Sequence, residues 1–189
     1  GSNIELGSSG NTFADAVTMK AETDGSEAFG NITFVDSGAV DFDSSGSSDG
    51  DLNINASSTN GAVGGNLSIT ATDHITQNIA LDIGGTTTLA TGSSKNITLD
   101  NTSNDFQDAV KIITGSSSGG NNITLVDAGD IDLGASTVSG TYAVTATSGD
   151  ITDSGNLAIT GAATFITAAT GSNIILDASG NAFAAAVTM

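Results

Sequence analysis

The chain has 189 residues, a formal net charge of −18, 25 glycines, and neither proline, cysteine nor tryptophan. Its only basic residues besides one histidine are Lys20, Lys95 and Lys111. Without cysteine, disulfide frameworks and thiolate metal sites are excluded. Because affinity for a phosphate backbone comes from Lys and Arg, nucleic acid is excluded as a partner.

Along the chain, short alternations of apolar and polar residues predict strands. They occupy residues 52–54, 67–69, 97–99, 123–125 and 157–159. Such runs, bounded by Gly, Ser, Asn and Asp, are typical of strands with one buried face. Low complexity and high charge are also typical of disorder. The 38% apolar content and this patterning favour a folded all-β chain instead.

Helices and membrane spans are not expected. No window has a helical period of apolar residues, and no run of 18 apolar residues occurs. We therefore expect no membrane insertion in this segment. The first residues also lack the basic and apolar regions of a signal peptide, so none is expected within this sequence.

An internal repeat is the strongest signal. Residues 1–19 and 171–189 are identical at 14 of 19 positions, at an offset of 170 residues, and a weaker copy begins at Ser94. Self-similarity of this kind is typical of a stacked array. The copies share a skeleton of Asn, Ile, Leu, Asn and Phe, which comprises Asn3, Ile4, Leu6, Asn11 and Phe13, then Asn96, Ile97, Leu99, Asn104 and Phe106, then Asn173, Ile174, Leu176, Asn181 and Phe183.

Two further motifs recur between the copies of the skeleton. Residues 30–42 match residues 121–133, and residues 51–71 match residues 141–161. These matches divide the chain into two unequal halves, with residues 73–85 as the extra turn of the first half.

The repeating unit therefore spans about residues 1–170, in half-repeats of about 1–93 and 94–170. Residues 171–189 begin the next unit. We interpret residues 1–189 as a single solenoid segment, a window of a longer repeat array.

Short strands joined by loops of uneven length predict a parallel β-solenoid, or β-helix, because loops can bulge from its corners without disturbing the stack. We predict seven to eight coils of roughly 24 residues, stacked about 4.8 Å apart. Small apolar residues would fill the lumen, and Gly, Asn and Asp would occupy the corners. The predicted coil starts are Val17, Leu52, Leu67, Thr87, Val110, Tyr142, Phe165 and Val187.

Three segments resemble a known family. Residues 84–112, 121–140 and 148–161 are similar to the repeat region of filamentous-haemagglutinin-like bacterial adhesins, which include two-partner secretion exoproteins and autotransporter-type giant adhesins. The resemblance implies a right-handed parallel β-helix shaft, export from the cell, attachment to the cell surface, and a role in adhesion or biofilm matrix.

The expected function is therefore a structural repeat of a long secreted bacterial surface or extracellular-matrix fibre, such as an adhesin shaft or a biofilm scaffold. Its partners would be neighbouring repeats of the same chain, other fibres or cell surfaces. The alternative is an adhesive module that binds through corner loops at residues 20–30 and 43–50.

Acidic clusters are the candidate metal sites. They comprise Asp41, Asp43, Asp49 and Asp51 in one stretch and Asp127, Asp130 and Asp132 in another. Oxygen-rich loops suit Ca²⁺, which takes about six to eight oxygen ligands. One alternative function is thus a calcium-stiffened solenoid. In the other interpretation no cofactor is bound, and the carboxylates form a solvated, repulsive coat that keeps a β-rich surface from aggregating.

We expect no enzyme and no catalytic residues. Paired carboxylates serve polysaccharide-degrading enzymes, but here the acids recur with the repeat, whereas an active site occurs once. His74 has no cysteine and no Ser–Asp constellation beside it. Threonines at 70, 72 and 86–88 suit an ice-binding array less well than ordinary strand surfaces, because the coils vary.

Overall fold

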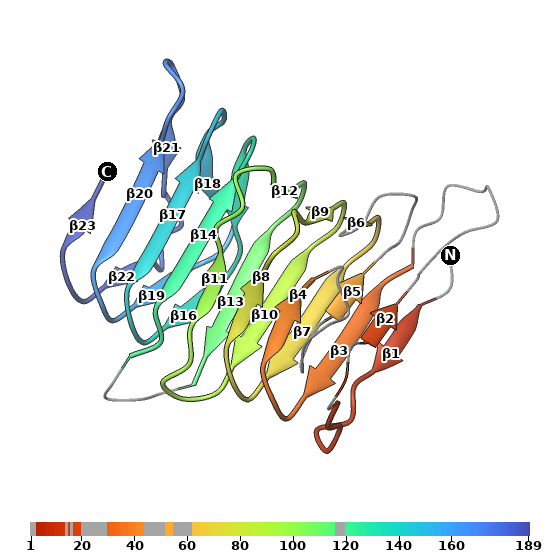
Figure 1. Ribbon diagram of the computed structural model, residues 1–189. Helices are drawn as coiled ribbons and strands as arrows, with labels where there is room; N and C mark the ends of the chain where they lie inside the picture. Colours follow the sequence, from red (N-terminus) through yellow and green to blue (C-terminus); the bar gives the residue numbers. More distant parts are fainter. Residues whose placement is uncertain are drawn as a thin grey trace.

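A computed structural model describes residues 3–13, 15, 17–19, 30–43, 52–54, 62–115 and 120–189 (Figure 1). Regular structure in these ranges is β-strand alone, and they hold no helix that could cross a membrane. The strands of successive turns lie side by side, with the N-terminus at one end of the stack and the C-terminus at the other (Figure 1).

The described residues form short strands of two to five residues. They are β1 (Ile4–Leu6), β2 (Val17–Met19), β3 (Ile32–Asp36), β4 (Val40–Phe42), β5 (Leu52–Ile54), β6 (Ala62–Val63), β7 (Leu67–Ala71), β8 (Ile75–Gln77), β9 (Asp82–Ile83), β10 (Thr87–Thr91), β11 (Ile97–Leu99), β12 (Asp105–Phe106), β13 (Val110–Thr114), β14 (Ile123–Asp127), β15 (Ile131–Leu133), β16 (Ser136–Val138), β17 (Tyr142–Ala146), β18 (Ile151–Asp153), β19 (Leu157–Ile159), β20 (Ala163–Thr167), β21 (Ile174–Ile175), β22 (Ala182–Phe183) and β23 (Val187–Thr188).

All strand pairs in these ranges are parallel, and each joins strands of successive turns. An eleven-stranded sheet runs in the order β1-β3-β7-β10-β13-β15-β18-β21 and also contains β16, β19 and β22. A seven-stranded sheet runs β4-β8-β11-β14-β17-β20-β23, and smaller sheets join β6-β9-β12 and β2-β5. The prediction of an all-β parallel solenoid is confirmed.

The predicted number of coils was wrong. The structure has about five continuous turns rather than seven to eight, and these run from Leu67 in β7 to Ile174 in β21. There the eleven-stranded sheet pairs Leu67 with Thr87, Thr87 with Val110 and Val110 with Leu133. The pairing offset is therefore 20 to 23 residues in this stretch, slightly below the predicted 24.

The error arose because the predicted coil starts belong to different sheets. Val17 pairs with Leu52 in the two-stranded sheet, whereas Thr87 lies in the eleven-stranded sheet and Tyr142 in the seven-stranded one. Alternation shows which residues point inward but not which side of the solenoid a strand occupies. Strands of different sides were therefore counted as one series.

The core is a column of apolar side chains inside the turns. In β3, β14 and β17 buried residues alternate with half-buried ones, as one inward face requires. In-register pairing then stacks similar side chains along the axis, for example Ile75 on Ile97 and Ile97 on Ile123. Burial of this apolar surface is the main stabilising contribution, at about 25 cal/mol per Å².

The aromatic ring pairs of the described residues lie toward both ends of the stack. Near the C-terminus the ring of Tyr142 meets Phe165 edge to face at 6.0 Å, and Phe165 meets Phe183 at 6.1 Å. Near the N-terminus Phe13 stacks on Phe34 at 5.0 Å. These geometries are the favourable ones for aromatic pairs.

Matching sequence motifs do not occupy matching sides. The segment 30–42 places its first strand, β3, in the eleven-stranded sheet and its second, β4, in the seven-stranded sheet. Its counterpart 121–133 does the reverse, with β14 in the seven-stranded sheet and β15 in the eleven-stranded one. The two half-repeats are thus rotated relative to each other by one side of the solenoid.

Candidate functional site

Three corners of the solenoid carry chains of hydrogen bonds from side chain to backbone. At the first, the Oδ1 of Asn3 accepts the N–H of Asn31 at 3.0 Å, that of Asn31 accepts the N–H of Asn66 at 2.8 Å, and that of Asn66 accepts the N–H of Thr86 at 2.9 Å. Each turn therefore supplies an acceptor to the next. We call this chain the asparagine ladder.

A second corner has the same arrangement, begun by a histidine. The Nδ1 of His74 accepts the N–H of Asn96 at 2.9 Å. The Oδ1 of Asn96 then accepts the N–H of Asn122 at 3.0 Å, and that of Asn122 accepts the N–H of Thr141 at 3.1 Å. The ring of His74 thus supplies the first acceptor of this ladder.

The third corner uses aspartates. The Oδ1 of Asp130 accepts the N–H of Asp150, and the Oδ1 of Asp150 accepts the N–H of Asn173, both at 2.7 Å. Asp130 is one of the predicted metal ligands. In the structure its carboxylate bonds to the backbone of the following turn.

The second asparagine of the skeleton builds a tight turn. The N–H groups of Asn11, Asn104 and Asn181 each donate to the carbonyl three residues earlier, at 3.1 Å in every copy. The side chains of Asn11 and Asn104 also donate to the carbonyls of Leu6 and Leu99. The skeleton therefore encodes a strand, a turn stabilised by asparagine and an aromatic residue that returns to the core.

Burial of the skeleton differs among its copies. Its members Ile97, Leu99, Asn104 and Phe106 are buried. The corresponding apolar residues of the end copies are half-buried and pack against the core; they are Ile4, Leu6, Phe13, Ile174, Leu176 and Phe183.

Asn104 is the centre of a buried polar network that sequence inspection missed. Its Oδ1 accepts the N–H of Leu81 at 2.9 Å, and its Nδ2 donates to the carbonyl of Val126 at 3.1 Å. Gln77 bonds to both ends of its amide. Asn121 has a similar role at another corner, where its Nδ2 donates to the carbonyls of Gly92 and Lys95. Asn104 belongs to the repeated skeleton, whereas no sequence signal distinguishes Asn121 from its exposed neighbours.

Among the predicted metal ligands that the structure describes, Asp127 is the buried one. Its two carboxylate oxygens accept the N–H of Phe106 at 2.8 Å and of Gly129 at 2.6 Å. Burial raises its pKa to about 6, although these two hydrogen bonds act in the opposite direction. Its carboxylate therefore closes a corner between turns.

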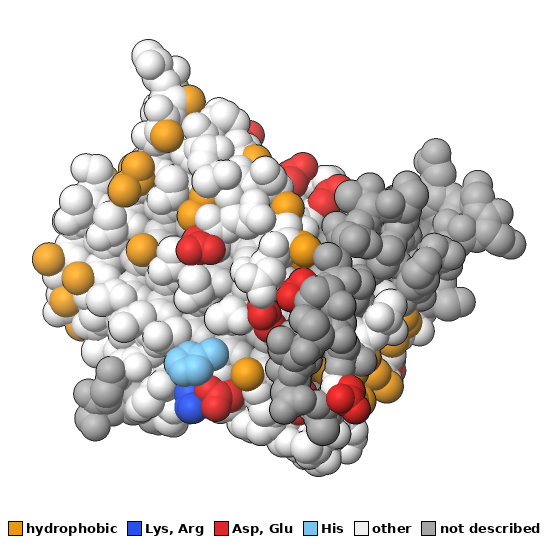
Figure 2. All heavy atoms as spheres, in the orientation of Figure 1, with side chains coloured by type: hydrophobic (Ala, Val, Ile, Leu, Met, Phe, Trp, Pro, Cys, Tyr) orange, Lys and Arg blue, Asp and Glu red, His pale blue; other side chains and the backbone are white. Residues whose placement is uncertain are grey.

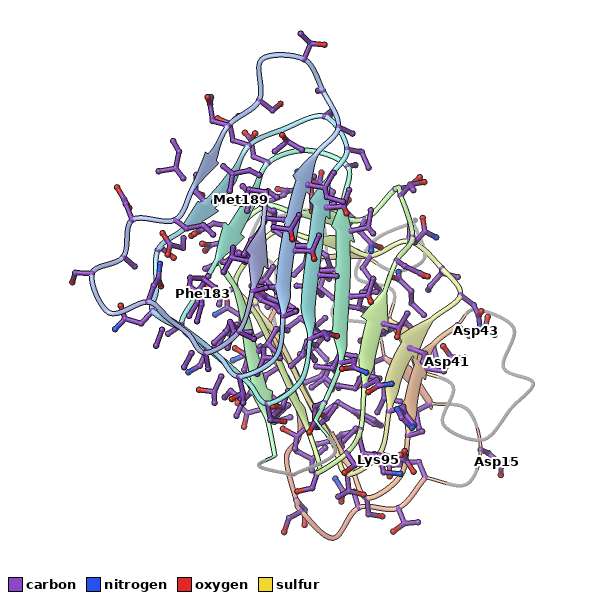
Figure 3. All side chains as sticks on the ribbon, turned by 90° about the vertical axis from the view of Figure 1, so that its left-hand side faces the viewer. Asp15, Asp41, Asp43, Lys95, Phe183 and Met189 are labelled. Carbon is purple, nitrogen blue, oxygen red and sulfur yellow. The ribbon has the colours of Figure 1, made fainter. Side chains whose placement is uncertain are left out.

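The other candidate acids lie apart or outside the described residues. Asp132 accepts the N–H of Ser154 at 2.7 Å, and Asp41 accepts from the side chain of Asn78 at 2.8 Å. Asp41 and Asp43 lie near each other at one edge (Figure 3). Asp49 and Asp51 lie outside the described residues, as do loops 20–29 and 44–50 of the predicted adhesive face.

No metal centre is assembled in the part that the structure describes. Within it, no group of three or more His, Asp or Glu side chains is arranged to hold an ion. Acidic side chains are scattered over the face in Figure 2. Asp105, Asp108, Asp130 and Asp132 line a shallow hollow of about 290 Å³.

One ion pair lies beside the histidine corner. The Nζ of Lys95 is 2.8 Å from the Oδ1 of Asp73, which also accepts the N–H of His74. The hydrogen bond from Lys95 lowers the pKa of Asp73, and the bond from His74 adds to this effect. Both side chains are partly exposed, so the pair contributes little to stability.

The fold and these ladders define a parallel β-solenoid built from stacked repeats, in which the polar side chains serve the stack. Residues 58–113 and 120–189 match a family described as "Repeats of unknown function (DUF5649)", and the chain belongs to that family. No curated protein and no solved structure matches the chain.

Proposed function

We propose that the chain is a structural repeat in the shaft of a long secreted bacterial fibre, at the cell surface or in the extracellular matrix. The observation that carries the proposal is the direction of the corner ladders, which run along the solenoid axis. Their side chains are engaged in holding successive turns together. Such an arrangement serves a rod better than a binding pocket or an active site.

The way in which stability adds up from turn to turn supports the role of a structural shaft. Each turn contacts its neighbours, so stability grows as a sum of nearest-neighbour interactions and extends with length. Parallel strands pair on both edges within the stack, which leaves edges at its ends. A chain of such units makes a long rod without needing a larger core.

The acidic surface supports an exposed rod. A net charge of −18 makes neighbouring rods repel one another, and this limits association between their β-rich flanks. Location outside the cell rests on the resemblance of three segments to the adhesin repeats. The winding is proposed to be right-handed, as crossovers between parallel strands almost always are.

Electron microscopy of the native material tests the proposal. We expect unbranched rods whose diffraction has a meridional spacing of about 4.8 Å, the distance between stacked strands. Antibodies against the chain should decorate the rods along their length on intact cells. Globular particles, or antibody access only after the cells are broken, would contradict the proposal.

A further inference from the structure

The structure presents one sequence twice, in two surroundings. Residues 1–19 and 171–189 are near-identical. In the first copy, β1 pairs with β3 and β2 with β5, which follow it in the chain. In the second copy, β21 pairs with β18 and β23 with β20, which precede it. The two copies therefore show opposite edges of the same turn.

We propose that the outer edge of residues 174–189 is a docking surface for a second copy of residues 30–43 and 52–54, in the register that β3 and β5 adopt on β1 and β2. Ile174 would pair with the second copy's Ile32, and Val187 with its Leu52. The inference deepens the proposed shaft and rests on it, since it defines how one unit joins the next.

Exposure of one residue supports this assignment. Met19, at the end of β2, is paired with Ile54 of β5 and is 3% exposed. Met189 occupies the same place in the repeat and is 75% exposed. Val187 is 38% exposed at the same end, whereas its counterpart Val17 is half-buried. Phe183 and Met189 face the viewer at this end in Figure 3. This apolar surface matches the one that β3 and β5 cover at the other end.

The aromatic residues fit the same junction. Phe183 packs edge to face on Phe165 of the turn before it. Its counterpart Phe13 stacks on Phe34 of the turn after it. Superposing the two copies joins these contacts into one column, in which Phe183 lies between Phe165 and the second copy's Phe34.

A corner ladder also passes through the junction. The N–H of Asn173 donates to Asp150 in the turn before it. The Oδ1 of its counterpart Asn3 accepts the N–H of Asn31 in the turn after it. The same side chain can thus make both bonds at once, because one uses its backbone donor and the other its side-chain acceptor.

Hydrogen exchange in a tandem protein tests the junction. The tandem consists of residues 1–189 followed directly by a second copy of residues 20–189. An Ala185→Ser change at an exposed position of the first unit gives its peptides a different mass from those of the second unit. In the first copy the N–H of Ile4 donates to the carbonyl of Asn31 at 2.9 Å. We expect exchange at Ile174 of the first unit to slow by about a hundredfold or more relative to the single chain, as for a strand paired within a stable stack.

Two variants of the second copy identify the register. Ile32→Asp places a charge at a buried position of the docking strand and should return exchange at Ile174 to the single-chain rate. Thr33→Asp, on the half-buried neighbour, should leave protection in place. Protection of β14 in the first unit confirms in both cases that this unit is folded.

Two results would overturn the proposal. One is unchanged exchange at Ile174 in a tandem whose second unit is itself protected. The other is a second unit without protection, since docked strands would order it. Absence of rods from native material, with a protected junction, would contradict the shaft alone; rods with an unprotected junction would contradict only this register.

Discussion

Gln77 and Asn104 exchange two side-chain hydrogen bonds between adjacent turns. The Nε2 of Gln77 donates to the Oδ1 of Asn104 at 2.7 Å, and the Nδ2 of Asn104 donates to the Oε1 of Gln77 at 2.8 Å. Because Asn104 is fully buried, its amide must satisfy all its partners inside the protein.

We expect Asn104→Leu to lower the free energy of unfolding by about 1–3 kcal/mol, since the N–H of Leu81 and the amide of Gln77 lose their partner. Chemical denaturation of the whole chain measures the change. The control is Thr102→Ala, which alters an exposed residue of the same turn. Equal stability of Asn104→Leu and wild type would mean that this network has no net stabilising effect.

The asparagine ladder predicts a smaller effect at an exposed corner. Asn66→Ala removes the acceptor for the N–H of Thr86, and we expect a loss of about 0.5–1.5 kcal/mol. Asn66→Asp keeps an acceptor oxygen and should retain most of the stability, measured at moderate salt. If both variants lose equally, the hydrogen bond is not the cause.

Gly155 lies where two turns approach closely. A Cβ built there would be 2.1 Å from the backbone nitrogen of Ala135, an atom that cannot move aside alone. Gly155→Ala should therefore cost about 1–3 kcal/mol through overpacking. Gly10→Ala is the matched control, because a Cβ at Gly10 meets nothing within 4 Å. Similar thermal midpoints for both variants would refute the close approach.

Asp127 predicts a pH dependence with a defined sign. Its pKa is about 6 in the folded chain against 3.8 for the free group, so between these values the folded state holds the proton more tightly. Stability should therefore fall as pH rises from about 4 to 6. Asp127→Asn removes this titration, so the free energy of unfolding of the wild type, relative to that of the variant, should decline between about pH 4 and pH 6. A carboxyl titration midpoint below 4, measured by NMR, would contradict this.

Calcium should have no specific effect on this chain. Asp127, Asp130 and Asp132 already accept backbone N–H groups, and binding an ion would compete with those bonds. We expect the same thermal midpoint with Ca²⁺, with Mg²⁺ at equal ionic strength, and with a chelator. A rise with Ca²⁺ beyond that with Mg²⁺ would instead favour the calcium-stiffened solenoid.

Much of the fold followed from local patterns in the sequence. Alternation predicted the inward residues of β7, β11, β14 and β19, because a two-residue period depends only on the pleat. The number of turns did not follow, since it depends on which sides the strands occupy. That assignment is decided by loop lengths and corner geometry, which alternation does not report.

The polar positions were harder to predict for a different reason. Skeleton residues Asn3 and Asn96 stand out in the sequence because they repeat, and in the structure both are ladder acceptors. Asn121 and Gln77 lie in no repeated position of the skeleton, yet they make buried bonds. Their importance depends on contacts 18 to 30 residues away in sequence, which only the stacking of turns brings together.

Rotation of the half-repeats has a consequence for how such genes can change length. The skeleton strand of the first and last copies, β1 and β21, lies in the eleven-stranded sheet, whereas that of the middle copy, β11, lies in the seven-stranded one. The last strand of the copy also changes place, because β2 of the first copy pairs with β5 in the two-stranded sheet, whereas β23 of the last copy lies in the seven-stranded sheet. Loss of a half-unit would turn the distal part of the molecule about its axis and present a different side to its surroundings.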